Sequence, residues 1–157
     1  MKRLIFVTAC ITVLAGAAVA SAGFSGDPCN LVTAAQMHSV HVARQKCIKT
    51  HSAAALGTSD IASWGKLGAT PSSLQVVVIH STNPAALAFV EQREHLGPKL
   101  AIGEWAEGDT QNGRTGASIA FVKHGYYVLI HAQTPVGKPL PSLAPAVALA
   151  KQLAAKF

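Results

Sequence analysis

The sequence predicts an α+β domain in which about three helices pack on a mainly antiparallel sheet stapled by one disulfide. Three observations predict this class. Residues 116–133 hold two apolar runs around His124-Gly125, the pattern of an antiparallel hairpin. Residues 141–157 carry apolar side chains at four-three spacing, the pattern of an amphipathic helix. Two cysteines remain after the amino-terminal leader, and an even count is typical of a disulfide in an oxidising compartment.

The leader has the pattern of a cleaved signal peptide. The basic pair Lys2-Arg3 precedes a long apolar run, which ends in the A-x-A cleavage signal Ala20-Ser21-Ala22. We therefore expect residues 1–22 to be removed and residues 23–157 to form a single domain. The alternatives are an uncleaved anchor, a cut two residues earlier, and lipidation of Cys10.

The first part of the mature chain is expected to contain one helix and one strand. Residues 29–42 place apolar side chains along one stripe and predict a helix, with Asn30 or Thr33 as its cap. Residues 44–51 have the length and alternation of a strand. Residues 53–73 are rich in glycine and predict a loop with a short helical turn in its middle.

The second part is expected to supply most of the sheet. Residues 74–80, LQVVVIH, are β-branched and apolar on both faces, which is typical of a central strand. Residues 83–96 predict a helix that an asparagine caps and a Gly-Pro pair stops. Residues 99–108 are expected to begin as an extended segment. The hairpin of residues 116–133 and the helix of residues 141–157 complete the chain.

Cys29 and Cys47 are expected to be bonded to each other. Closing a loop of this size contributes on the order of 3 kcal/mol in the chain-entropy model. The alternative is a redox-active pair, but that chemistry usually requires a C-x-x-C spacing at a helix start, and the two cysteines lie much further apart. The spacing therefore favours a structural staple between the first helix and the first strand.

His38, His41 and His51 are weak candidates for a metal site. His38 and His41 are three residues apart, so they would lie on one helix face. An antiparallel return of the next strand would bring His51 level with them, and three imidazoles suit zinc or copper. The disulfide would remove the nearby sulfur ligand, and no neighbouring carboxylate orients the rings. We therefore expect no tight metal site and no cofactor.

A cluster of carboxylates is the candidate for catalysis. Glu104, Glu107 and Asp109 fall in GEWAEGDTQNGRTG, which predicts a polar loop whose carboxylates could flank a sugar. His80 and His131 each end a strand and would meet only if those ends were adjacent. The sequence has neither a G-x-S-x-G elbow nor a phosphate loop. We therefore expect no catalytic residues.

The charge pattern argues against nucleic acid as a partner. The formal net charge is +6, but the basic residues are scattered, and only Arg44, Lys46 and Lys49 cluster. A nucleic-acid interface needs a denser basic stripe with stacking aromatic side chains.

Two short motifs resemble those of a broad set of exported bacterial proteins. Cys29, Leu31, Val32 and Thr33 match an opening C-x-L-[LV]-[ST]. In AIGEWA, residues 101–106, the chain matches G-x-G-[DE]-x-A except that Ala101 stands where the first glycine is expected. Several such proteins are similar to the PsbP-like α/β/α sandwich. The resemblance implies a fold used mostly for binding and assembly, and it implies no catalytic residues.

These observations lead us to expect an exported, soluble binding or accessory protein without catalytic activity, periplasmic or secreted, with no stable membrane span after signal cleavage. Its partner would be a protein or a small-molecule ligand that the sequence does not identify. The alternatives are a periplasmic metal-binding protein that uses the three histidines, a hydrolase that uses the Glu104–Asp109 loop, and an inhibitor of a periplasmic toxin.

Overall fold

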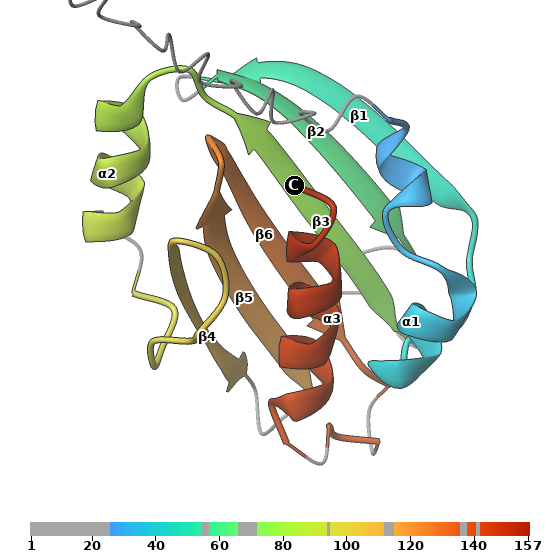
Figure 1. The fold of residues 1–157 in the computed structure, drawn as a ribbon. Coiled ribbons are helices and arrows are strands. Elements are labelled where there is room, and N and C mark those ends of the chain that lie inside the picture. Colours follow the sequence, from blue (N-terminus) through green and yellow to red (C-terminus); the bar gives the residue numbers. More distant parts are fainter. Residues whose placement is uncertain are drawn as a thin grey trace, which may run out of the picture.

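The strands form one six-stranded antiparallel sheet. The computed structural model describes residues 26–54, 57–65, 72–93, 95–111, 115–135, 138–140 and 142–157; the expected signal peptide, with Cys10, lies outside these ranges. The sheet has the order β1-β2-β3-β6-β5-β4 (Figure 1). Its strands are β1 (Cys47–Ala54), β2 (Gly57–Trp64), β3 (Ser73–His80), β4 (Trp105–Gln111), β5 (Gly116–Lys123) and β6 (Tyr126–Gln133).

Helices lie on both faces of this sheet. They are the 3-10 turn η1 (Pro28–Asn30), α1 (Ala34–Ser39), α2 (Pro84–Arg93) and α3 (Ala144–Ala154). On one face, a buried cluster joins Leu149 of α3 and Met37 of α1 to Val76 of β3. On the other face, a smaller cluster joins Val90 of α2 to Tyr127 of β6. We call these the α3 face and the α2 face; α1 and α3 lie in front of the sheet in Figure 1.

The predicted sheet, helices and disulfide are confirmed in outline. Strand β3 covers the predicted LQVVVIH, and it pairs with β6 of the predicted hairpin. The hairpin turns at His124 and Gly125, whose φ angles of 47° and 83° are those of a type I′ turn. Asn83 caps α2, since its Oδ1 accepts a hydrogen bond from the Ala85 amide at 3.0 Å.

The predicted helix over residues 29–42 is wrong in extent. The chain forms η1, breaks, and starts again as α1 after Thr33, whose hydroxyl accepts from the Gln36 amide in a capping box. The helix ends at Ser39 because His41 adopts a positive φ of 59°. Apolar spacing alone did not reveal either interruption.

Two segments predicted as loops are strands. Strand β2 occupies the segment expected to hold a helical turn, and it pairs along its length with both β1 and β3. Strand β4 contains Glu107 and Asp109, which were expected on a polar loop. In both cases small and polar residues form a strand because neighbouring strands supply the hydrogen-bond partners, which overrides the weak local preference.

Among residues 26–157, apart from the gaps given above, no helix is long and apolar enough to cross a membrane.

Candidate functional site

The disulfide between Cys29 and Cys47 is present, as predicted. Its sulfur atoms are 1.97 Å apart and its Cα atoms 5.8 Å apart. It ties η1 to the first residue of β1. The side chains of β1 that share the Cys47 side, Lys49 and His51, face the same surface as η1.

The structure does not bring the three weak candidates for metal binding, His38, His41 and His51, to one place. The chain leaves Cys29, runs out through α1 and returns to the staple at Cys47. Residues after Cys47 therefore continue past the staple, away from α1. His51 lines one hollow and the other two histidines line another. Within the described residues, no group of three or more His, Cys, Asp or Glu side chains is placed to hold a metal ion.

The hollow beside His51 contains one ion pair and one histidine–aspartate hydrogen bond. It has a volume of about 400 Å³. Lys49 Nζ lies 3.0 Å from Asp27 Oδ2, and His51 Nδ1 lies 2.7 Å from Asp60 Oδ1. The Cys29 amide also donates to Asp27, and this bond, followed by that from Lys49, lowers the pKa of the Asp27 carboxyl. The charges of this hollow are thus already matched within the chain.

The hollow beside His38 differs in charge, because its lining has basic side chains but no carboxylate. We call it the His38 hollow; it has a volume of about 250 Å³ and is lined by His38, His41, Val42, Ala43, Ser72, Pro135 and Lys138. Its three ionisable side chains are all basic and exposed. Ser72 is buried at 2% exposure, and its Oγ accepts a hydrogen bond from the Ala43 amide at 3.2 Å. The lining contains no carboxylate.

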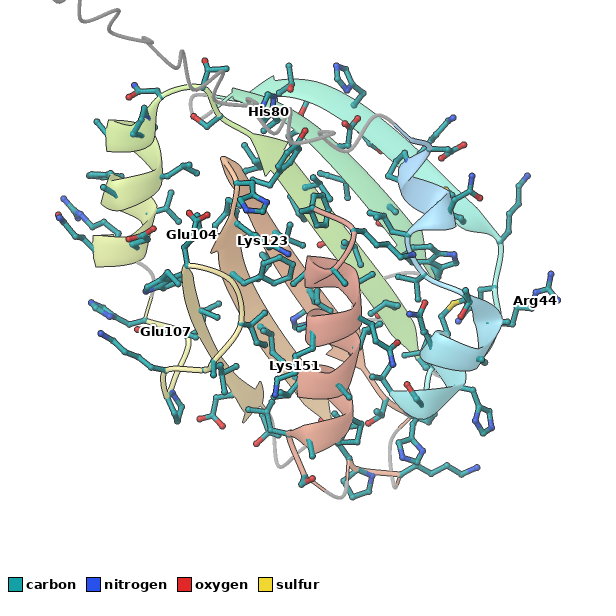
Figure 2. All side chains as sticks on the ribbon, viewed as in Figure 1. Arg44, His80, Glu104, Glu107, Lys123 and Lys151 are labelled. Carbon is teal, nitrogen blue, oxygen red and sulfur yellow. A yellow bond between two sulfur atoms is a disulfide. The ribbon has the colours of Figure 1, made fainter. Side chains whose placement is uncertain are left out.

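The three candidate catalytic carboxylates, Glu104, Glu107 and Asp109, each have different surroundings. Glu104 Oε1 accepts from the His124 amide at 2.9 Å and so supports the β5–β6 turn. Asp109 Oδ1 accepts from the Thr110 amide next to it. Glu107 is 8% exposed, and its Oε2 has no hydrogen-bond partner among the described residues. Glu104 and Glu107 are labelled beside β4 in Figure 2. Two of the three carboxylates therefore have structural bonds.

A row of polar side chains crosses the α2 face of the sheet, and the sequence did not predict it. The strand register places Ser118, His131, Gln75 and Ser63 side by side. The Ser118 hydroxyl and His131 Nδ1 are 2.8 Å apart, and the Gln75 amide donates to Ser63 at 3.4 Å. Burial lowers the pKa of His131. Alternation within each strand could have shown the face, but only the register brings these four residues together.

His80 and His131 do not meet. Strands β3 and β6 are antiparallel, so His80 lies opposite Tyr126 while His131 lies opposite Gln75. The His80 ring instead stacks on Tyr126, with centroids 4.6 Å apart.

Comparison with protein-family models, curated proteins and solved structures gave no match for this chain.

Proposed function

We propose that the protein is an exported, non-catalytic binding protein that docks a partner protein on the β1 side of its sheet. The observation that carries this proposal is a sheet surface with three aliphatic side chains, Ile48, Ile61 and Val77, that no described helix covers. Helix α2 packs over β5 and β6 through Val90 and Leu87. Ile79 of β3 packs against the same cluster, but no described helix packs over the rest of this face of β1, β2 and β3. We call this part the uncovered face; it consists of Ile48, Thr50, Ile61, Ser63, Gln75 and Val77.

Burial differs sharply between the two sides of these strands. On the α3 face, Ala62 and Val76 are both 0% exposed. On the uncovered face, their neighbours Ile61 and Val77 remain partly exposed, and Ile48 is 63% exposed. Apolar groups grouped on one surface and bordered by polar groups are typical of a protein interface.

The edge of the sheet beside Ile48 supports an extended segment as the docking element. At the other edge, the chain covers β4 with its own residues, since the Leu100 amide donates to the Ala106 carbonyl and the Gly108 amide to the Pro98 carbonyl. No described residue forms an equivalent backbone bond with the outer edge of β1. An unpaired edge accepts an added strand through main-chain hydrogen bonds.

The charges beside this edge select the partner. Arg44 and Lys46 precede β1 and are exposed, and Figure 2 shows Arg44 pointing away from the sheet. Lysine and arginine at an edge repel a second copy of the same basic edge. They attract an acidic segment, so the same residues that oppose self-association favour an acidic partner.

Export and fold relationship are part of the same proposal. The signal-peptide pattern of residues 1–22 supports export, and the disulfide fits an oxidising compartment. The PsbP-like resemblance is supported by helices on both faces of an antiparallel sheet.

Site-specific photo-crosslinking in the export compartment tests this function. A photoreactive amino acid at position 48 should form a discrete adduct with one partner, and Arg44→Glu with Lys46→Glu should reduce that adduct. The matched control is the same amino acid at Ala148, an exposed position on α3. Equal adducts at both positions, or none at position 48, would contradict the proposal.

A further inference from the structure

We infer that the His38 hollow binds a small oxyanion through His38, His41, Lys138 and the hydroxyl of Ser72. This site is separate from the proposed protein-docking surface. It lies where the end of α1, the start of β3 and the segment after β6 meet. The inferred ligand group is a phosphoryl, sulfuryl or carboxylate group, because all these groups present several acceptor oxygens and negative charge.

The basic side chains of the His38 hollow are not matched by a carboxylate in its lining. Two exposed basic side chains elsewhere, Lys49 and His51, each face an aspartate. His38, His41 and Lys138 face no carboxylate in the hollow and have no ion pair or side-chain hydrogen bond within the described residues. They are also the only titratable side chains in its lining. An anion in the hollow would meet donors from three segments and no repelling carboxylate.

Ser72 supplies a buried hydroxyl in the lining of the hollow. Ser72 Oγ is used as an acceptor by the Ala43 amide. A hydroxyl that accepts one bond still has its own hydrogen to donate. No described acceptor receives a bond from this hydroxyl, although Ser72 is 2% exposed. A ligand oxygen would satisfy it.

His41 adopts a backbone conformation that is uncommon for residues other than glycine. The His41 amide donates to the His38 carbonyl at 3.0 Å, and the Val42 amide donates to the Met37 carbonyl at 2.9 Å. These bonds form a Schellman motif, in which the residue at the position of His41 is usually glycine. Here it is histidine with a φ of 59°. The chain keeps an imidazole at the hollow where glycine would fit the backbone better, which points to a role for the ring.

The same two bonds also reduce the repulsion that the end of α1 would exert on an anion. Free carbonyl oxygens at the carboxyl end of a helix repel anions. The carbonyls of Met37 and His38 are engaged by backbone amides, so the repulsion at this end of α1 is reduced. The volume of about 250 Å³ lies below that of a typical drug-sized pocket, which suits a small ion or a single terminal group.

Sulfate and phosphate titrations followed by NMR of the full exported chain test the inference. Sulfate should shift the ring resonances of His38 and His41, with saturation, and should leave His95 unchanged. Phosphate reports whether the site prefers a phosphoryl group.

Two variants and a control distinguish a built site from general attraction to a basic protein. His41→Gly retains the helix ending and removes the ring, and Lys138→Gln removes a charge; each should weaken sulfate binding at least fivefold. His95→Gln, at an exposed position outside the hollow, should bind as the parent does. Shifts that spread over all histidines, or binding that neither variant weakens, would overturn the inference.

Discussion

His41 and His124 are the two non-glycine residues with positive φ in the described part of the chain. Their side chains differ in what they contact. The His124 ring bonds through Nδ1 to the Phe157 carbonyl at 2.8 Å, which holds the end of the chain beside the hairpin turn. The His41 ring has no described partner and borders the His38 hollow. The strained backbone at His124 is thus offset by a bond within the fold, whereas that at His41 has no such bond.

His41→Gly should therefore stabilise the protein. Glycine adopts a positive φ without steric cost, so we expect a gain of about 0.5–1 kcal/mol in the free energy of unfolding. Urea denaturation at neutral pH measures it. His124→Gly is the matched control: the same relief is offset by loss of the bond to Phe157, so it should gain less. A loss of stability in His41→Gly would mean that its ring makes contacts important to the fold.

His131 should make stability depend on pH. Burial lowers the pKa of His131 below its ordinary value, so the unfolded chain binds the proton more readily than the folded one. The free energy of unfolding should then be highest above about pH 6.5 and fall as the pH drops through the unfolded pKa.

His131→Gln tests this dependence. Glutamine can still bond the Ser118 hydroxyl but does not titrate, so urea denaturation across pH 7.5 to 5 should show a shallower loss of stability in the variant. His95→Gln should keep the slope of the parent protein. An unchanged slope in His131→Gln would assign the pH dependence to other groups.

At the scale of elements, the disulfide holds the least secure part of the fold. Helix α1 is six residues long, and helices of that length are not stable alone. It is held by the capping box at Thr33, by Met37 and Val40 in the core, and by the staple that fixes the turn before it. The staple also fixes the position of Cys47 at the start of β1, and His51 further along this strand lines a different hollow from His38.

Replacing Cys29 and Cys47 together by serine should lower stability by about 2–5 kcal/mol. Hydrogen exchange should show the loss of protection first in α1 and β1, because the loop that the staple closes contains α1 and ends at β1. The parent protein under reducing conditions serves as the comparison, and β3 and β6 should keep their protection in both. Uniform loss over the whole sheet would contradict this local role.

The sequence predicted the elements whose patterns are strong and missed those that depend on neighbours. The β-branched run VVVI is sufficient to predict β3, and the His124-Gly125 pair is sufficient to predict the turn of the hairpin. By contrast, GTSDIASW of β2 has little apolar alternation beyond Ala62 and Trp64, and its strand form depends on pairing with β1 and β3. The separation of His38 from His51 likewise needed the direction of β1 at the staple. Spacing gives distances along the chain but not the direction in which a strand leaves a covalent link.

At the scale of the whole molecule, the sheet is covered unequally. The α3 face carries the larger core, which includes Phe121, Ile119 and Leu153, all 0% exposed. On the α2 face, the described packing is confined to the cluster around α2, Leu96 and Trp105. In the proposed function, the part of this face that no described residue covers is the docking surface. The exposed Arg44 and Lys46 border it and would favour an acidic partner.

The two faces should therefore respond oppositely to substitution. Val76→Ala removes fully buried methyl groups from the α3 face and should cost about 2 kcal/mol or more in the free energy of unfolding. Ile48→Lys changes a side chain that is 63% exposed, so stability should stay within about 0.5 kcal/mol of the parent. Because β1 is an edge strand, lysine there also costs little in pairing.

The same two variants should also differ in binding. Ile48→Lys should abolish formation of the partner adduct, here measured with the photoreactive amino acid at Thr50. Val76→Ala should reduce the adduct only as far as it reduces the amount of folded protein. A large stability loss in Ile48→Lys would show that position 48 belongs to the core rather than to a docking surface. Retained adduct formation in that stable variant would place the partner elsewhere.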